Sequence, residues 1–358
     1  MLSATSADQA TIFVLNPGST STKLAIYEGE NELCREAVLH DADVLRRFSR
    51  VWDQFDWRLE IVGKWFHRAG RNPAVVTAIG GLLKPIPKGA YRVNDRMLHD
   101  ARSNVQGEHS SNLGCALAYE LAREYGCEAF VVDPVSVDEF ESLAKYSGHP
   151  MIQRRSLSHA LNIHAAVRQA AGQLGISVSG SSFVVAHLGG GISIAAVRDG
   201  LIIDVNDASS DGPFSPERTG GLPLQPFISM CFSGTTSEQE IRRLVMGSGG
   251  LQAYLGTNSA KEVESRIEAG DSAAREVYEA MAYQIAKEIG AMATVLHGNV
   301  HAIVLTGGLA ASQMLTHWIS ERIRFIAPIL IFPGEDEMRA LAMGTLRVLR
   351  FQEEVKEY

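Results

Sequence analysis

The sequence predicts an α/β protein made of two similar halves, and three observations lead to this prediction. Short apolar segments of strand length alternate with longer segments in which apolar residues have helical spacing. The opening pattern of strand, polar or glycine-rich loop and second strand returns near the middle of the chain. Finally, 358 residues are more than a single hydrophobic core usually holds, which favours two domains.

In the first half, apolar runs bounded by glycine, proline or polar residues indicate buried strands. They lie at residues 12–15, 24–27, 74–79 and 129–133. Residues 110–126 have helical spacing, with serines before the pattern and Gly126 at its end. A polar stretch with tryptophans at 41–65 is also predicted to be helical, and 154–175 is predicted to be a long helix that bridges toward the second half.

The second half repeats the opening pattern. Strands are expected at 183–188, 192–197 and 300–308, with a tight hairpin at Asp199-Gly200, and helices at 237–246, 273–296 and 335–349. His187 follows Asn16 at close to half the chain length, so the two halves begin alike. We therefore expect domains at 1–155 and 156–358, with the last helix packing back on the first domain.

Composition narrows the class of protein. Hydrophobic residues make up 46% and charged residues 21%, which is typical of a globular protein, and the net charge of −8 argues against a general nucleic-acid or anionic-membrane surface. Four scattered cysteines without a CxxC pair suggest neither a zinc knuckle nor a disulfide framework. No signal peptide is evident and no apolar run reaches the roughly 18 residues of a membrane span. These features predict a reduced, cytoplasmic protein.

Three loops that follow predicted strands have the composition of anion-binding loops. They are NPGSTSTK, HLGGGIS and LTGGLAAS. Glycine lets backbone N–H groups approach an anion, and hydroxyl groups add further donors. One such loop could be a plain turn, but three at corresponding strand ends indicate phosphate binding. The patterns GxxxxGK[ST] and GxGxxG are absent, so the common phosphate-binding folds are not supported.

The order of these motifs resembles the butyrate kinases of the acetokinase family, within the acetate and sugar kinase, heat-shock and actin superfamily. The resemblance runs from about Thr11 to about Arg350 and includes GGLLKPI, GEHSSNLG, VVDPVSVDE, RRSLSHALN, GPFSPERTGGLP and PGEDEMRALAMG. It implies two duplicated ribonuclease-H-like domains with a nucleotide cleft between them. It also implies reversible transfer of phosphate from ATP, with Mg²⁺, to a short-chain carboxylic acid such as butanoate, and a homodimer or larger homo-oligomer.

The resemblance also implies site residues. The expected catalytic residues are Arg218, Asp133, His187, His159 and His109. Nucleotide and phosphate binding is expected at Asn16, Ser19, Ser21, Lys23, Gly189, Gly190, Gly191, Gly307 and Gly308, and metal binding at Asn16, Asp133 and Asp336. Each has a plain structural alternative, such as capping by His109 and Asp133, a turn at Asn16, a surface position for Arg218, or helix N-terminal charge for the acidic cluster 335–337. His159 and His164 lack an acidic third ligand, so no zinc site is expected.

One position departs from the family pattern. Butyrate and acetate kinases have an arginine immediately before the first Gly-Gly, and here that position is Ile79. Losing one charge-assisted contact costs roughly 1.5–3 kcal/mol. The alternatives to a butyrate kinase are therefore an acetate- or propionate-type kinase, and a nucleotide-binding member with impaired catalysis.

Overall fold

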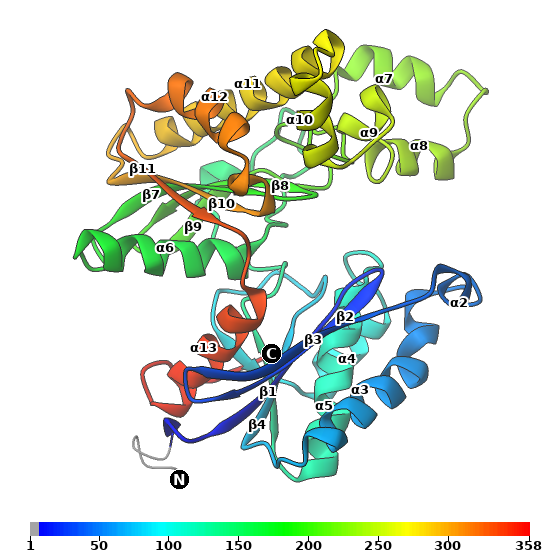
Figure 1. The fold of residues 1–358 in the computed structure, drawn as a ribbon, viewed down its shortest axis with the longest axis vertical. Coiled ribbons are helices and arrows are strands. Elements are labelled where there is room, and N and C mark those ends of the chain that lie inside the picture. The colour runs from blue at the N-terminus through cyan, green and yellow to red at the C-terminus, as the bar shows by residue number, and fades with distance from the viewer. Residues whose placement is uncertain (1–6) are drawn as a thin grey trace. The chain divides into compact units, whose positions relative to one another are not determined.

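The structure is a computed structural model that describes residues 7–358 (Figure 1). It contains two compact units. Unit 1 comprises the described residues up to Val137 together with Asp336–Tyr358, and unit 2 comprises Asp138–Glu335. The boundary therefore lies earlier than the expected one after residue 155. The reason is local, because the backbone N–H of Glu141 donates to the carbonyl of Ile203 at 3.1 Å, which ties this segment to unit 2.

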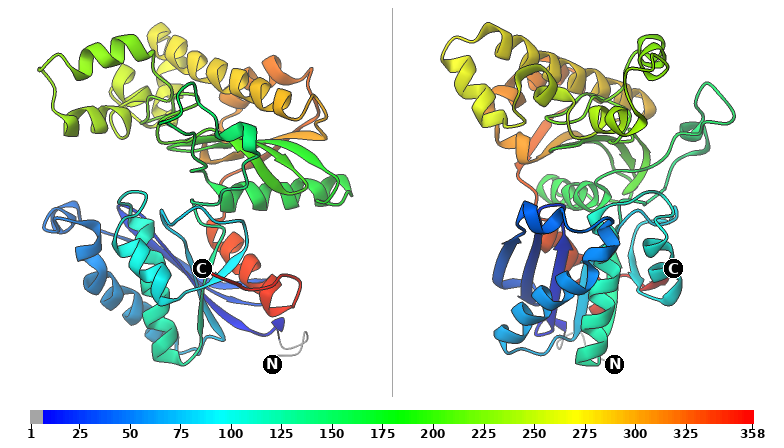
Figure 2. Two further views of the ribbon diagram at one scale, coloured as in Figure 1. Left: turned by 180° about the vertical axis from the view of Figure 1, so that it is seen from behind. Right: turned by 90° about the vertical axis from the view of Figure 1, so that its right-hand side faces the viewer.

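Unit 1 is built on a seven-stranded sheet in the order β12-β5-β6-β4-β1-β2-β3. Its strands are β1 (Thr11–Pro17), β2 (Ser21–Glu28), β3 (Asn31–Leu39), β4 (Val75–Ile79), β5 (Ala90–Arg92), β6 (Glu128–Val132) and β12 (Lys356–Glu357). Its helices are α2 (Ala42–Leu45), α3 (Phe55–Ala69), α4 (Asp95–Arg102), α5 (Leu113–Tyr125) and α13 (Glu337–Leu349). Helices α3 and α5 cover one face of the sheet and α13 covers the other (Figure 2).

Unit 2 has a five-stranded sheet in the order β11-β10-β7-β8-β9. The strands are β7 (Ser182–Leu188), β8 (Ile192–Arg198), β9 (Leu201–Val205), β10 (Ala302–Gly307) and β11 (Ile329–Pro333). Helices α6 (Ala160–Leu174), α11 (Ser272–Val295) and α12 (Gln313–Ile323) pack beside the sheet, and α7 (Leu224–Cys231), α8 (Glu238–Val245), α9 (Gly250–Leu255) and α10 (Ala260–Glu268) follow β9 in sequence. The buried side chains of α11, from Ala274 to Ala293, belong to the core of this unit.

The two sheets share one topology. In unit 1, β1 pairs antiparallel with β2 and parallel with β4. In unit 2, β7 pairs antiparallel with β8 and parallel with β10. The run β3-β2-β1-β4-β6 thus corresponds strand by strand to β9-β8-β7-β10-β11. The predicted α/β fold of two duplicated domains is confirmed.

Some elements differ from the prediction for identifiable reasons. Strand β3 was not expected, because it lies at the edge of the described sheet and eight of its nine residues, all except Val38, are exposed, so it lacks a buried face. Helix α6 begins at Ala160 and not near 154, since the guanidinium of Arg154 instead donates to the carbonyls of Ala144 and Val205. The predicted helix at 41–65 is divided into α2, the 3₁₀ turn Val51–Gln54 and α3.

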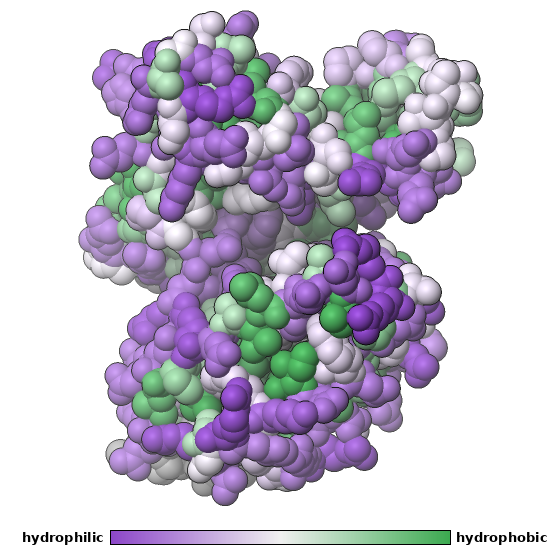
Figure 3. All heavy atoms as spheres, turned by 45° about the vertical axis from the view of Figure 1, so that its right-hand side comes forward, coloured by the Kyte–Doolittle hydropathy of each residue, from purple (hydrophilic) through white to green (hydrophobic). Residues whose placement is uncertain are grey.

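The surface is mainly hydrophilic on the face shown in Figure 3, with hydrophobic residues in separate groups. Within residues 7–358, no helix has both the length and the apolar character needed to cross a bilayer. All four cysteines, Cys34, Cys115, Cys127 and Cys231, are free thiols.

Candidate active site

The carboxyl ends of three parallel strands form the first candidate region, in unit 1. Leu15 of β1 pairs with Ala78 of β4, and Ile79 of β4 pairs with Val132 of β6. One edge of the sheet therefore carries Asn16, Ile79 and Asp133. Ligands of open α/β sheets bind outside this edge, and the sequence motifs predicted the site residues there.

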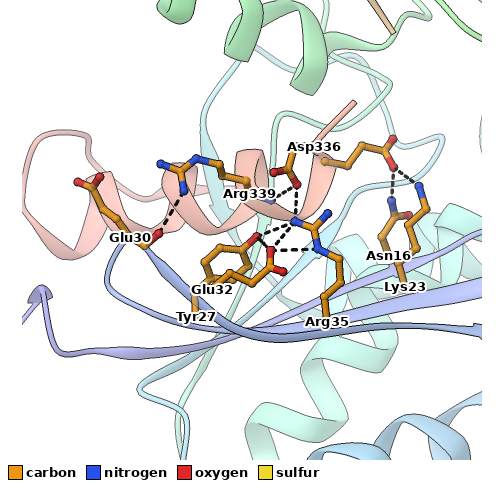
Figure 4. Close-up of polar contacts among 9 residues, drawn as sticks. Asn16, Lys23, Tyr27, Glu30, Glu32, Arg35, Asp336 and Arg339 are labelled. Atoms are coloured by element: carbon orange, nitrogen blue, oxygen red, sulfur yellow. Dashed lines mark hydrogen bonds and ion pairs between the residues drawn. The ribbon is translucent and has the colours of Figure 1, made fainter. Parts of the chain in front are cut away.

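Asn16 and Lys23 share one carboxylate. They face each other across the β1–β2 pair, and the Asn16 amide and the Lys23 ammonium both donate to Oε2 of Glu337, at 2.6 and 3.1 Å. Figure 4 shows both side chains pointing toward α13, on which Glu337 lies. Glu337 was not among the expected site residues, although its acidic neighbour Asp336 was.

Asp336 has a different environment. Its carboxylate forms an ion pair with Arg35 at 2.5 Å and accepts a hydrogen bond from the backbone N–H of Arg339, which caps α13 (Figure 4). Arg35 in turn contacts Glu32 and the hydroxyl of Tyr27. Of the adjacent acids in this segment, Glu337 is thus the one beside Asn16. Sequence alone gave no signal for this choice, since it depends on the first turn of α13.

Asp133 follows β6 directly and is only 2% exposed. Its backbone φ of 39° is unusual for a residue with a side chain. Gly89 fixes it from two sides, because the Gly89 N–H donates to Oδ1 at 2.7 Å and the Gly89 carbonyl accepts from the Asp133 N–H at 3.0 Å. Strained backbone positions that the surroundings hold in place occur preferentially at functional sites.

The hydroxyl loop between β1 and β2 presents different side chains to its two sides. Ser19 is exposed and Ser21 is partly exposed, whereas Thr22 is fully buried. A hydrogen bond from the Gly18 N–H to the Ser21 carbonyl at 2.8 Å closes the turn. Arg58, from α3, contacts the buried side of this loop, and sequence analysis did not identify it.

His109 lies just before the 3₁₀ turn Ser110–Asn112 and has a capping role. Its Nδ1 accepts a hydrogen bond from the Ser111 backbone N–H at 3.2 Å and lies 2.7 Å from the Ser111 hydroxyl. His109 therefore caps this turn, which is the structural alternative that the sequence allowed. The residue is exposed.

Ile79 ends β4 at a tightly packed turn. A Cβ on Gly80 would lie 2.4 Å from Pro134 Cβ, and one on Gly81 would lie 2.2 Å from Asn112 Oδ1. The backbone at Ile79 is also fixed by Gly114 of α5, because a Cβ there would lie 2.2 Å from the Ile79 carbonyl. The backbone of GGLLKPI is thus held in place, while the Ile79 side chain remains partly exposed.

In unit 2, two of the expected histidines stack on each other. The rings of His159 and His187 have centroids 4.2 Å apart and an interplanar angle of 24°. His159 Nδ1 lies 2.9 Å from the Ser193 hydroxyl, and His187 Nε2 lies 3.4 Å from Oε2 of Glu335. His187 is 1% exposed, and its Nδ1 has no hydrogen-bond partner within residues 7–358.

The glycine loop Gly189–Gly191 lies against Arg218. A Cβ on Gly191 would lie 2.4 Å from Arg218 Nη1, so a side chain there would have to displace the guanidinium. Arg218 Nη1 donates to the Ala208 carbonyl at 2.9 Å, and its Nε has no partner within the described chain. Burial lowers the pKa of Arg218, against the opposing effect of Glu217 and Asp207, but an arginine stays charged at neutral pH.

The third loop adjoins the second. Gly307 ends β10 with φ 92°, and a Cβ there would lie 2.4 Å from the carbonyl of Leu188, directly before the glycine loop. Gly307 and Gly334 also exchange backbone hydrogen bonds of 3.0 and 2.9 Å. Gly308 begins the 3₁₀ turn Gly308–Ala311, and a Cβ there would meet nothing within 4 Å.

Each unit therefore gathers its own set of expected residues at one sheet edge. Unit 1 brings together Asn16 and Lys23, with Asp133 two strands away on the same edge. Unit 2 brings together His159, His187, the glycine loop, Arg218 and Gly307. Sequence reasoning missed Arg58, and it considered Glu335 and Glu337 only as members of the acidic cluster 335–337. Each of the three contacts an expected residue through a side-chain or backbone atom.

Comparison with known proteins identifies relatives of the whole chain. A family model described as the acetokinase family matches residues 150–326. The chain is 51% identical to a protein named "Probable butyrate kinase 2" from Caldanaerobacter subterraneus subsp. tengcongensis, over 97% of this chain and 99% of that protein. It is 46% identical to "Butyrate kinase 2" of Clostridium acetobutylicum, with the same coverage. Acetate kinase from Porphyromonas gingivalis has a similar fold, with a TM-score of 0.75, 17% identity and coverage of 95% of this chain and 100% of that one.

Proposed function

We propose that this chain, which belongs to the acetokinase family, is a carboxylate kinase of the butyrate kinase type. It would transfer the terminal phosphate of ATP to a short-chain carboxylic acid and release an acyl phosphate and ADP, reversibly. The observation that carries the proposal is the 51% identity, over nearly the full length of both proteins, to a protein named as a probable butyrate kinase.

The chemistry fits the groups that each unit presents. A carboxylate is already ionised at neutral pH, so the acceptor needs no general base. The difficulty is to bring two anions together and to stabilise charge on the phosphoryl group during transfer, which calls for fixed donors and cations. Unit 1 offers the hydroxyl loop with Lys23, and unit 2 offers the glycine loop with Arg218.

We assign Arg218 to the transferring phosphoryl group. Its Nη1 is held by the Ala208 carbonyl, its Nε has no partner among residues 7–358, and Gly191 leaves space for it beside the glycine loop. A guanidinium held in one orientation makes two parallel hydrogen bonds to phosphoryl oxygens. The stacked His159 and His187 would orient each other, and either ring would donate a hydrogen bond to a phosphoryl oxygen when its outward nitrogen carries the proton.

The residues of unit 1 fit Mg²⁺. No group of three or more His, Cys, Asp or Glu within residues 7–358 is placed to hold a metal ion alone. Mg²⁺ in kinases keeps several waters and is bound by one or two carboxylates and the substrate phosphates, so a small oxygen set suits it. The ion would be held by the carboxylates of Asp133 and Glu337 and by the side-chain oxygen of Asn16. Glu337 takes the role expected of Asp336, because Glu337 lies beside Asn16 and Asp336 is paired with Arg35. When bound, Mg²⁺ would neutralise phosphate charge.

The test is direct detection of acyl phosphate as its hydroxamate, with purified protein, ATP, Mg²⁺ and unbranched acids of two to five carbons. Highest kcat/KM with butanoate supports the proposal. Highest kcat/KM with acetate or propionate supports the second candidate, an acetate- or propionate-type kinase. Nucleotide binding without any acyl phosphate would favour the impaired alternative, which the comparisons do not specifically support.

Two further properties belong to the same proposal. The four free thiols and the absence of a disulfide among them are consistent with a cytoplasmic location. Family resemblance implies a homodimer or larger assembly, and light scattering of the purified chain against its 38.9 kDa mass measures this directly.

A further inference from the structure

The hydroxyl loop of unit 1 rests on a buried arginine. Arg58 of α3 is 1% exposed, and it is among the largest fully buried side chains of the described chain. Its Nη1 donates to the Gly18 carbonyl at 2.9 Å and to the Thr22 hydroxyl at 3.0 Å, with a longer contact of 3.4 Å to the Ser21 carbonyl. The guanidinium thus holds both ends of the turn from inside.

No carboxylate balances this charge. Nε and Nη2 of Arg58 both donate to Oε1 of Gln54, at 3.0 and 2.8 Å, and no Asp or Glu within residues 7–358 pairs with it. Burial lowers the pKa of Arg58 to about 10, so the side chain remains a cation at neutral pH. Buried charges are usually paired, because leaving water without a counter-charge is unfavourable.

The neighbouring histidine does not add to the charge. The Thr22 hydroxyl accepts a hydrogen bond from Arg58 and lies 2.8 Å from His40 Nε2. Burial and the charge of Arg58 lower the pKa of His40 to about 4, so His40 is neutral at neutral pH. Arg58 is the single cation of this cluster.

We propose that Arg58 is a positioning residue for the phosphate groups of the nucleotide. Arg58 binds the Gly18 and Ser21 carbonyls on the buried side of the loop, while Ser19 and Thr20 are exposed on its outer side. Its unbalanced charge makes the outer side of the loop favourable for an anion. This inference rests on the proposed kinase function and adds to it a residue that no phosphate-loop motif contains.

The test distinguishes the effect of the Arg58 charge on phosphate binding from a purely structural role of the side chain. Arg58→Gln, Arg58→Lys and the wild type are titrated by calorimetry with MgADP and with adenosine, which lacks phosphate. Arg68→Gln is the matched control, because Arg68 lies on the same helix but is exposed. We expect Arg58→Gln to weaken MgADP binding at least about tenfold, and to leave adenosine binding within about twofold, because a hydrogen-bonded charge is lost. Arg68→Gln should change neither.

Arg58→Lys keeps the charge without the guanidinium fork, so it should restore most of the MgADP affinity, to within about threefold of the wild type. In kinetics, Arg58→Gln should raise KM for ATP and leave KM for the carboxylate unchanged. Equal losses for MgADP and adenosine would contradict the proposal and indicate a structural role alone. So would unchanged MgADP affinity in Arg58→Gln.

If Arg58→Gln does not fold, Arg58→Lys decides by itself. A tenfold loss of MgADP affinity in that variant, with adenosine binding unchanged, would contradict the role of the charge. Wild-type protein that forms no acyl phosphate but binds MgADP through Arg58 would remove the kinase assignment and leave this inference standing. Wild-type protein that binds no nucleotide would remove both.

Discussion

The loops that open the two units occupy the same place in one topology and use opposite arrangements of charge. In unit 1 the β1–β2 loop carries hydroxyl groups, and its arginine, Arg58, lies buried behind it. In unit 2 the β7–β8 loop is three glycines, and its arginine, Arg218, lies against Gly191, where any Cβ would clash. Duplication has preserved the strand order but not the means of presenting positive charge.

The difference explains the composition of each loop. A loop with its cation behind it can carry side chains, and Ser19, Thr20 and Ser21 are at least partly exposed. Where the cation lies against the loop, at Gly191, a side chain would have to displace it. The two loops should therefore respond differently to substitution, and this is open to measurement.

The largest effect should come from removing the cation of unit 2. Arg218→Ala should lower kcat by about 100- to 1000-fold, as removal of a preorganised donor to developing charge does elsewhere, with a much smaller rise in KM for ATP. Steady-state acyl-phosphate formation measures this. Arg242→Ala, on the exposed face of α8, is the control and should retain wild-type rates. A kcat within about threefold of wild type for Arg218→Ala would end the assignment.

The next effect tests the geometry of the glycine loop. Gly191→Ala should displace the Arg218 guanidinium, because the new Cβ would lie 2.4 Å from Nη1, and should lower kcat by about 10- to 100-fold. Gly172→Ala on α6 is the control, since its Cβ would meet nothing within 4 Å, and it should retain wild-type rates. The same rates in both variants would show that Arg218 does not depend on the space beside Gly191.

A smaller effect distinguishes the two acids at the start of α13. Glu337→Gln should raise the Mg²⁺ concentration for half-maximal activity by about tenfold, because it weakens a group that contacts or orients metal ligands. Asp336→Asn removes the exposed ion pair with Arg35 and should cost at most about 1 kcal/mol of unfolding free energy. Its Mg²⁺ dependence should not change. A changed Mg²⁺ dependence in Asp336→Asn, with none in Glu337→Gln, would instead show that Asp336 contributes to metal binding.

Much of the fold could be predicted from the sequence, but less of the candidate site could. The buried strands β1, β2, β7 and β8, and the loops between them, follow from apolar runs broken by glycine and hydroxyl residues. Strand β3 did not, because an exposed edge strand lacks the apolar alternation that marks a buried face. Arg58 has no local signal at all, since its partners Gly18 and Thr22 lie far away in the sequence.

Family resemblance supplied the expected residues, and the structure shows how they are grouped within each unit and which side chains contact one another. Nothing in the letters Glu335-Asp336-Glu337 says which acid turns toward Asn16 and which caps the helix. Only the start of α13 settles it. Likewise, the stacking of His159 on His187 requires α6 to begin beside the end of β7, and the sequence predicted that helix to begin earlier.

The last expected effect comes from giving unit 1 an arginine at its strand edge, in addition to Lys23, as unit 2 has Arg218 beside its glycine loop. Ile79 follows Ala78, which pairs with Leu15, so its side chain lies level with Asn16 on the face that α13 covers. It is partly exposed, which leaves a long side chain a path out to solvent. Ile79→Arg should therefore raise kcat/KM about tenfold, the effect of one charge-assisted hydrogen bond, without lowering the melting temperature.

The control is Ile79→Met, which adds length without charge and should leave kcat/KM within about twofold of the wild type. Two measurements on each variant decide the matter, acyl-phosphate formation and thermal unfolding. Lower activity together with a lower melting temperature in Ile79→Arg would mean that the guanidinium is buried without a partner, which destabilises a folded protein. Ile79 would then belong to an apolar surface that replaces the family arginine. In that case unit 1 would keep an apolar side chain at this strand end, and the arginine in front of a loop would be a feature of unit 2.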